Sequence, residues 1–302
     1  MAITAFTAAS SAVDAPKRRS KVALFLLLPG LLYLALFFLV PLVSLVITSL
    51  QVPDPVVFGR YTTAFNIQTY GEVIAEYGTQ ILRSFFYALL ATIFALLFSY
   101  PLAYFIGVKV RRWPILQGLM IVLVIAPFFI SFLLRTLAWK SILSDDGVVV
   151  SALKGLSLLG SQDHFTGTPA AVVFGLTYNF IPFMCLPLYT TLERLDVRYL
   201  EAASDLYAGP FHTFRTVTLP LSLPGIVSGT LLTFIPAAGD YVNASSQFLG
   251  GSSSTMIGNV IQSNFLVQLN YPAAAALSII LMAIILVIVA VYVKRSGTDD
   301  LV

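Results

Sequence analysis

The chain has 302 residues, of which 58% are hydrophobic and only 10% carry a charge. This composition lies outside the range of ordinary soluble domains and is typical of a membrane protein. The formal net charge is +3, and the cationic residues collect in short segments between apolar runs. The charge is therefore explained by membrane orientation, and no nucleic-acid partner is expected.

The residue types that carry most enzymatic chemistry are scarce. Cys185 is the only cysteine, which excludes an internal disulfide and a cysteine-based metal cluster. His164 and His212 lack helical metal-ligand spacing. The sequence also contains no G-x-x-x-x-G-K-[ST] loop for binding ATP. We therefore expect no catalytic residue, no metal and no cofactor bound by this chain.

Residues 1–16 are rich in Ala, Ser and Thr, and we expect residues 1–20 to form a disordered cytoplasmic tail ahead of one transmembrane domain at 21–302. The apolar run that follows is too long for a cleaved signal peptide and has no small-residue cleavage site. This run is interpreted as a retained membrane anchor.

Six runs are long and apolar enough to cross the hydrocarbon core, which takes about 20 residues in a helix. They lie within 22–50, 82–108, 115–139, 169–192, 218–243 and 269–293. Helices are expected because a chain in lipid must satisfy its own backbone, and these runs lack the two-residue period of barrel strands. The sequence thus predicts an all-α, polytopic fold with six transmembrane helices in a lipid bilayer.

The loops differ in charge in a way that predicts orientation, because short cytoplasmic loops carry the excess of Lys and Arg. Basic residues precede the first run and follow the second, fourth and sixth. They are Lys17, Arg18, Arg19, Lys21, Lys109, Arg111, Arg112, Arg194, Arg198, Arg215, Lys294 and Arg295. The opposite loops are mainly acidic, so both termini are expected in the cytoplasm.

Prolines interrupt several runs at membrane depth, where each removes a backbone hydrogen bond and permits a kink. They are Pro101, Pro127, Pro182, Pro187 and Pro236. Since prolines are frequent in membrane helices, about half of these are expected to be structural only.

A polar segment at about 196–220, containing EAASDLYAGPFHTFRTVTLP, separates the fourth and fifth runs. Asp196 is expected to cap a short helix, and Glu201 and Asp205 lie four residues apart on one of its faces. Gly209 and the following proline end that helix, and a second segment begins near Phe211. From the residues alone, its apolar members predict either a surface covered by a partner or an interfacial amphipathic helix.

This segment resembles the EAA loop of bacterial ABC importer permeases, which docks onto a cytoplasmic ATPase. The resemblance implies a coupling role for Glu201, Ala202, Ala203, Asp205, Tyr207, Gly209, Phe211 and Pro220. One position departs from the family, which usually has glycine where this chain has Tyr207. We expect the turn to be displaced to Ala208, Gly209 and Pro210, because glycine tolerates a left-handed backbone more readily than tyrosine.

Further stretches resemble the spermidine/putrescine permeases. They are SYPLAYFIG at 99–107, PFFISFLLRTLAW at 127–139, GDYVNASSQFLGG at 239–251 and MIGNVIQSNF at 256–265. The resemblance implies the architecture of a type I ABC importer permease in the bacterial inner membrane. It also implies alternating access and three kinds of partner: a second similar permease, an ATPase dimer that binds ATP and Mg, and an extracellular binding protein.

Charged residues near membrane depth are costly and are therefore candidates for function. Asp240 lies near the end of the fifth run and could attract a polyamine together with the pathway candidates Tyr241, Tyr178, Phe180 and Trp139. The competing hypothesis is an ion pair between Asp240 and Arg135. The uncharged stretch 243–264 is expected to form an outer loop with a short helix.

Three alternatives remain at this point. The permease could carry another small solute. A secondary transporter acting alone would require inverted repeats and ion-coordinating groups at the midplane, and neither is evident. A membrane hydrolase would need a base near the serines at 252–254, and neither histidine offers one.

Overall fold

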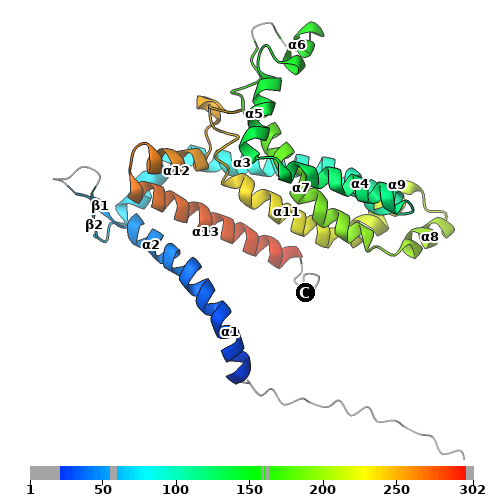
Figure 1. Ribbon diagram of the computed structural model, residues 1–302, viewed down its shortest axis with the longest axis horizontal. Coiled ribbons are helices and arrows are strands. Elements are labelled where there is room, and N and C mark those ends of the chain that lie inside the picture. The colour runs from blue at the N-terminus through cyan, green and yellow to red at the C-terminus, as the bar shows by residue number, and fades with distance from the viewer. Residues whose placement is uncertain (1–20, 55–59, 158–159, 161–162, 297–302) are drawn as a thin grey trace, which may run out of the picture. The chain divides into compact units, whose positions relative to one another are not determined.

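The computed structural model describes residues 21–54, 60–157, 160 and 163–296 (Figure 1). The expected tail at 1–20 lies outside the described residues. The chain divides into two compact units, Met1–Leu45 and Val46–Val302, which are described separately.

The first predicted span is an apolar helical segment. It comprises α1 (Lys21–Leu34), a π-helical turn at Ala35–Leu39 and the start of α2 (Val40–Ser49). The backbone N–H of Val40 donates to the carbonyl of Ala35, five residues back. The next residue, Pro41, has no N–H to donate, so the wider turn occurs where the regular helical ladder is interrupted. Phe25–Ser49 is long and apolar enough to cross a membrane.

Strands are nearly absent from the part of the chain that the structure describes. β1 (Val52–Pro53) and β2 (Tyr61–Thr62) form one short antiparallel pair in which Val52 lies opposite Thr62. Every other regular element described is helical, so the all-α prediction is confirmed.

Three long helices form the centre of the second unit. α3 (Gln68–Tyr104), with its π-helical continuation Phe105–Lys109, packs against α7 (Pro169–Glu193) and α11 (Leu223–Ala238) (Figure 1). Small residues allow the close approach, as is usual between membrane helices. Ala88, Ala91 and Ala95 of α3 are fully buried, and a Cβ added to Gly229 of α11 would lie 2.8 Å from the sulfur of Met184.

The remaining helices of this unit pack around that centre. α13 (Tyr271–Ser296) contacts α3 and α11, and α12 (Ile257–Leu266) contacts α3 and α13. The short helix expected in the outer stretch 243–264 is α12. Leu277, Ile257 and Ile81 bury their side chains together where these helices meet.

The third predicted span is broken, whereas a helix was expected throughout 115–139. α4 (Pro114–Ile125) continues as a 3₁₀ turn at Ala126–Phe129, and the chain bends by 95° before α5 (Phe132–Leu143) and α6 (Val148–Gly155). Pro127 cannot donate a helical hydrogen bond, and Ile130 and Ser131 have extended backbone conformations. The backbone therefore leaves the helical path between α4 and α5.

The fifth predicted span is also bent and is shorter than 218–243. The segment Pro210–Leu221 meets α11 at an angle of 66°, and α11 ends at Ala238. Ser222 lies at the bend, where its hydroxyl bonds to the hydroxyl of Tyr100 at 2.8 Å. Asp240 therefore lies in the loop after α11. With four continuous candidate spans and these two bent pairs, the described residues supply up to six spans.

The second predicted span is part of a longer helix. Gln68–Lys109 is continuous over 42 residues, so Glu72, Glu76 and Arg83 lie on the same helix as the apolar stretch. Of the five prolines expected to permit kinks, Pro127 lies at the 95° bend. Pro101, Pro182, Pro187 and Pro236 lie inside helices.

Candidate functional site

The polar segment between the fourth and fifth spans folds as two helical pieces joined by a turn. α8 (Val197–Asp205) is followed by α9 (Pro210–Thr213), a π-helical turn at Phe214–Thr218 and α10 (Leu219–Leu221). The carboxylate of Asp196 accepts a hydrogen bond from the N–H of Arg198 at 3.0 Å. The expected N-terminal cap is confirmed, and the carboxylate satisfies a backbone donor that the helix leaves unpaired.

The turn after α8 is centred on Tyr207, and the expected displacement toward Gly209 is wrong. Tyr207 has a φ of 58°, the left-handed conformation that favours glycine. Its N–H donates to the carbonyl of Ser204 at 2.9 Å, and the N–H of Ala208 donates to that of Ala203 at 3.0 Å. These two bonds form a Schellman motif, in which the left-handed residue is usually glycine.

Gly209 does not form the turn that was expected there, and instead precedes the next helix. Its φ of −65° and ψ of 159° are extended, and it directly precedes Pro210, the first residue of α9. Proline is well placed there because the first residue of a helix has no intrahelical acceptor for its N–H. Tyrosine therefore occupies the glycine position of the motif at a cost of roughly 1–2 kcal/mol.

The loop exposes a set of large apolar side chains. Leu206, Tyr207 and Phe211 are 82%, 97% and 76% exposed. Glu201, Ala202, Asp205, Gly209 and Pro220 are exposed too, whereas Ala203 is buried. Glu201 and Asp205 take part in no ion pair within the described residues. A surface of this kind, apolar with free carboxylates, suits a protein partner better than water.

A second group of polar side chains is buried among the helices and includes Asp240. The carboxylate of Asp240, only 8% exposed, accepts hydrogen bonds from the N–H of Asn243 at 2.8 Å and from its Nδ2 at 3.2 Å. Asn179 Nδ2 on α7 donates to Asn243 Oδ1 at 3.0 Å and to Thr136 Oγ1 on α5 at 3.2 Å. This polar cluster of Asp240, Asn243, Asn179 and Thr136 joins α5, α7 and the loop after α11.

The expected ion pair between Arg135 and Asp240 does not form in the described structure. Arg135 is 8% exposed, and its Nε and Nη1 atoms are buried without a hydrogen-bond partner among the described residues. Its guanidinium carbon lies 5.8 Å from the ring centroid of Phe132. The carboxylate of Asp240 instead accepts hydrogen bonds from Asn243, which is only three residues away in the same loop.

The aromatic pathway candidates are only partly brought together. The rings of Trp139 and Tyr178 lie 5.0 Å apart with an edge-to-face geometry. Tyr178 also lines a hollow of about 260 Å³ beside Pro127 and Pro182. Phe180 is buried in the helix core, and Tyr241 is 48% exposed. The candidates thus lie in three environments, and Trp139 with Tyr178 forms the one direct contact among their rings in the described residues.

Sequence reasoning missed three members of the polar cluster: Asn179, Asn243 and Thr136. Asn179 could have been found, because an amide inside an otherwise apolar span requires a partner. Two positions near the cluster are occupied by glycine where a larger residue would collide with its neighbours. A Cβ at Gly175 would lie 2.6 Å from Asn243 Oδ1, and one at Gly258 would lie 2.6 Å from the carbonyl oxygens of Gly239 and Asp240.

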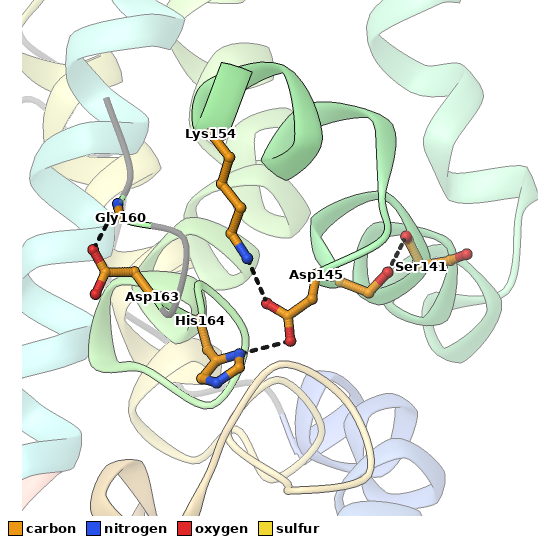
Figure 2. Close-up of polar contacts among 7 residues, drawn as sticks. Ser141, Asp145, Lys154, Gly160, Asp163 and His164 are labelled. Atoms are coloured by element: carbon orange, nitrogen blue, oxygen red, sulfur yellow. Dashed lines mark hydrogen bonds and ion pairs between the residues drawn. The ribbon is translucent and has the colours of Figure 1, made fainter. Parts of the chain in front are cut away.

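The segment between α5 and α7, which includes α6, contains a small group of charges (Figure 2). Asp145 Oδ2 lies 2.6 Å from His164 Nδ1, and its Oδ1 lies 3.6 Å from Lys154 Nζ. Asp163 Oδ2 accepts a hydrogen bond from the N–H of Gly160 at 2.9 Å. His164 thus has a structural partner, and these contacts connect the α5–α6 turn with the segment that precedes α7.

The long apolar helices, the broken spans and the polar loop before α11 are those of a multi-pass helical membrane protein. Residues 56–296 match the family described as binding-protein-dependent transport system inner membrane component. The chain belongs to this family, as the resemblance in its loop predicted, and it is a permease subunit of an ABC-type importer in the inner membrane.

Individual relatives extend along nearly the whole chain. The spermidine/putrescine transport system permease protein PotB of Haemophilus influenzae is 36% identical over 90% of this chain and 89% of its own length. PotB of Escherichia coli K12 is 34% identical over 87% of this chain and 94% of its own. A bacterial alginate ABC transporter, solved in complex with an alginate pentasaccharide-bound periplasmic protein, has a chain that aligns with a TM-score of 0.67. It shares 17% identity over 93% of this chain and 96% of that one, which shows the same type I permease fold.

Proposed function

We propose that this permease subunit forms part of a translocation pathway for polyamines of the spermidine/putrescine class. The observation that carries the proposal is the identity of 34–36% with the two PotB permeases over about nine-tenths of the chain. Identity at this level over most of both chains favours a shared substrate class as well as a shared fold. Another small solute is the alternative, and the buried cation of Arg135 supports it because a cation repels polycations.

The proposed assembly contains this chain, a second similar permease, two ATPase subunits and an extracellular binding protein. Both termini and the loop at 196–220 would face the cytoplasm, in agreement with the basic residues on that side. ATP and Mg would bind to the ATPase subunits, and hydrolysis would take place there. This chain would contribute a pathway and a mechanical connection.

The loop at 196–220 would be that connection. Leu206, Tyr207 and Phe211 would enter a groove of the ATPase, and Glu201 would contact its rim. The Schellman turn and the cap at Asp196 make α8 a short rigid element, so a movement at its surface would reach α11 through the π-helical turn and α10. Rigidity at the contact lets the loop transmit closure of the ATPase dimer rather than absorb it.

Asp240 would act mainly by holding the polar cluster together, since both of its oxygens accept hydrogen bonds from Asn243. Trp139 and Tyr178 are better placed to contact a polycation, because their rings meet edge to face, Tyr178 lines a hollow, and both rings can supply cation–π contacts. Tyr241 and Phe180 would line neighbouring parts of the pathway.

The test is ATPase activity of the reconstituted complex, with and without spermidine-loaded binding protein. Glu201→Ala is expected to remove the stimulation by spermidine, while Glu72→Ala, an exposed glutamate on α3, is the matched control and should retain it. Unchanged stimulation in Glu201→Ala would contradict the coupling role. Stimulation by another solute, with none by spermidine or putrescine, would contradict the substrate class but not the coupling loop.

A further inference from the structure

A groove of about 760 Å³ lies beside the loop at 196–220 and is separate from its exposed apolar side chains. One wall is the end of the long helix Gln68–Lys109, with Tyr104 and Val108, followed by Lys109, Arg111 and Arg112. The opposite wall comes from α8, α9 and the following turn, where Ser204 and Thr213 contribute hydroxyl groups. We call this the basic groove.

The charges of the basic groove have one sign. Its lining contains three cations and no Asp or Glu. Arg111 Nη1 donates to the carbonyl of Leu195 at 3.0 Å, which ties this wall to the segment before α8. Lys109 and Arg112 are exposed, and neither forms an ion pair within the described residues. The groove therefore offers an anionic group two cations, Lys109 and Arg112, together with hydroxyl groups such as those of Ser204 and Thr213.

The surroundings of the groove are those of a membrane surface. The guanidinium of Arg112 lies 4.5 Å from the ring centroid of Trp113, and Trp113 and Ile115 are 52% and 90% exposed. Tryptophan is enriched at the level of lipid headgroups. An acidic protein segment would contact only the cations, whereas an anionic phospholipid would place its headgroup at the cations and its acyl chains against the exposed apolar side chains of Trp113 and Ile115.

We propose that the basic groove binds the phosphate headgroup of an anionic phospholipid, with Lys109 and Arg112 as its cationic contacts and the acyl chains beside Tyr104, Val108 and Ile115. Basic pockets next to membrane helices on the cytoplasmic side have the charge and depth for such headgroups. The lipid would lie between the end of the α3 helix and the coupling loop, so membrane composition would influence the loop. The inference uses the cytoplasmic orientation proposed above, but its test does not depend on transport.

The experiment measures lipid preference from tryptophan fluorescence. Trp113 and Trp139 are the two tryptophans of the chain, so Trp139→Phe leaves Trp113 as the reporter beside the groove. The full chain is reconstituted in phosphatidylcholine vesicles that contain a minor fraction of brominated phosphatidylglycerol or of brominated phosphatidylcholine. The ratio of the two quenching efficiencies is compared within each variant, which cancels changes in intrinsic fluorescence.

We expect brominated phosphatidylglycerol to quench more strongly in the parent. Lys109→Gln with Arg112→Gln should lower the preference by about fivefold for each cation, and added salt should lower it in the parent as well. Lys109→Arg with Arg112→Lys should keep it. Arg198→Gln with Arg215→Gln removes the same charge outside the groove and is the matched control.

Three outcomes would overturn the proposal. The first is equal quenching by the two lipids in the parent, or equal loss in the groove and control variants. The second is displacement of the lipid by inorganic phosphate alone, which would indicate a site for free phosphate. The third is loss of the preference when the partner ATPase is added, which would indicate an acidic segment of that protein as the occupant.

Discussion

Asn179 Nδ2 on α7 donates a hydrogen bond to Asn243 Oδ1, 3.0 Å away in the loop that follows α11. The two residues are 64 positions apart in the sequence, and both are fully or nearly fully buried. Asn243 in turn holds both oxygens of Asp240. The Asp240 carboxylate, a charge near membrane depth, therefore has hydrogen-bond donors within its own loop. The bond from Asn179 connects that loop to α7.

Asn243→Ala is expected to destabilise the protein, because it leaves both Asp240 and Asn179 with buried polar atoms that have lost partners. Each such atom costs about 1–3 kcal/mol. The measurement is thermal unfolding of the purified protein in detergent. Asn66→Ala, an amide near the N-terminus of α3, serves as the control and should shift the midpoint less. A midpoint unchanged by Asn243→Ala would show that the cluster does not hold the loop.

Tyr207→Gly is expected to stabilise the end of α8, since glycine adopts the left-handed conformation without the cost of about 1–2 kcal/mol that a side chain incurs. The amide of Ala208, bonded to the carbonyl of Ala203, should exchange more slowly with deuterium in this variant. Tyr207→Val should have the opposite effect because a β-branched residue is worse at positive φ. Equal exchange in all three proteins would contradict a turn centred on residue 207.

The same substitution separates turn geometry from docking. If the tyrosine ring, 97% exposed, contacts the ATPase, Tyr207→Gly will weaken assembly of the complex although the turn itself is more stable. Co-purification of the ATPase measures the first effect and hydrogen exchange the second. Weaker assembly with slower exchange would assign Tyr207 to the interface, and unchanged assembly would remove it.

Gly258→Ala is expected to destabilise the contact between α12 and the loop after α11. The added methyl would lie 2.6 Å from the carbonyl oxygens of Gly239 and Asp240, and overpacking against backbone typically costs about 1–3 kcal/mol. Gly78→Ala on α3 has open space around its Cβ and should be neutral or stabilising by roughly 1 kcal/mol. The unfolding midpoint of Gly258→Ala should fall, and that of Gly78→Ala should stay the same or rise.

Arg135→Met is expected to leave stability unchanged or to raise it, because two of its nitrogen atoms are buried without hydrogen-bond partners among the described residues. Replacing an uncompensated buried charge by an apolar chain of similar length removes a desolvation cost. The unfolding midpoint and spermidine transport are measured together. A large fall in the midpoint would show that Arg135 is paired in the folded protein after all, whereas retained stability with lost transport would assign it a functional role.

At the two ends of α8, the local sequence predicted the N-terminal cap correctly and the C-terminal turn incorrectly. Asp196 precedes a helix whose first N–H groups need acceptors, and this requirement lies within three residues of the sequence. The turn at Tyr207 was predicted wrongly, since a preference for glycine was treated as a requirement. The hydrogen bonds to Ser204 and Ala203, together with the fixed start of α9 at Pro210, outweigh the local cost at tyrosine.

For the membrane spans too, some features could be predicted from the sequence and others could not. The summed hydrophobicity of about 20 residues decides whether a segment is stable in lipid, so all six apolar runs could be found from composition. The break at Ile130 and Ser131 was not found, because Pro127 alone only weakens one turn and many membrane helices continue through proline. The direction of α5 after the break depends on what it packs against, including Asn179 and Phe174 of α7.

The amino-acid sequence by itself determined the membrane class, the six apolar segments, the family and the position of the polar loop. These features depend on the hydrophobicity of continuous segments and on short motifs, and both are properties of residues that are neighbours in the chain. Only the tertiary structure decided that Asp240 bonds to Asn243 and not to Arg135, that Asn179 joins α5 to the loop after α11, and that Lys109 and Arg112 face α8 across a groove. Most of these contacts join segments far apart in the chain, and Asp240 bonds to a neutral amide although charge alone favours a cation, because packing geometry decides which groups meet.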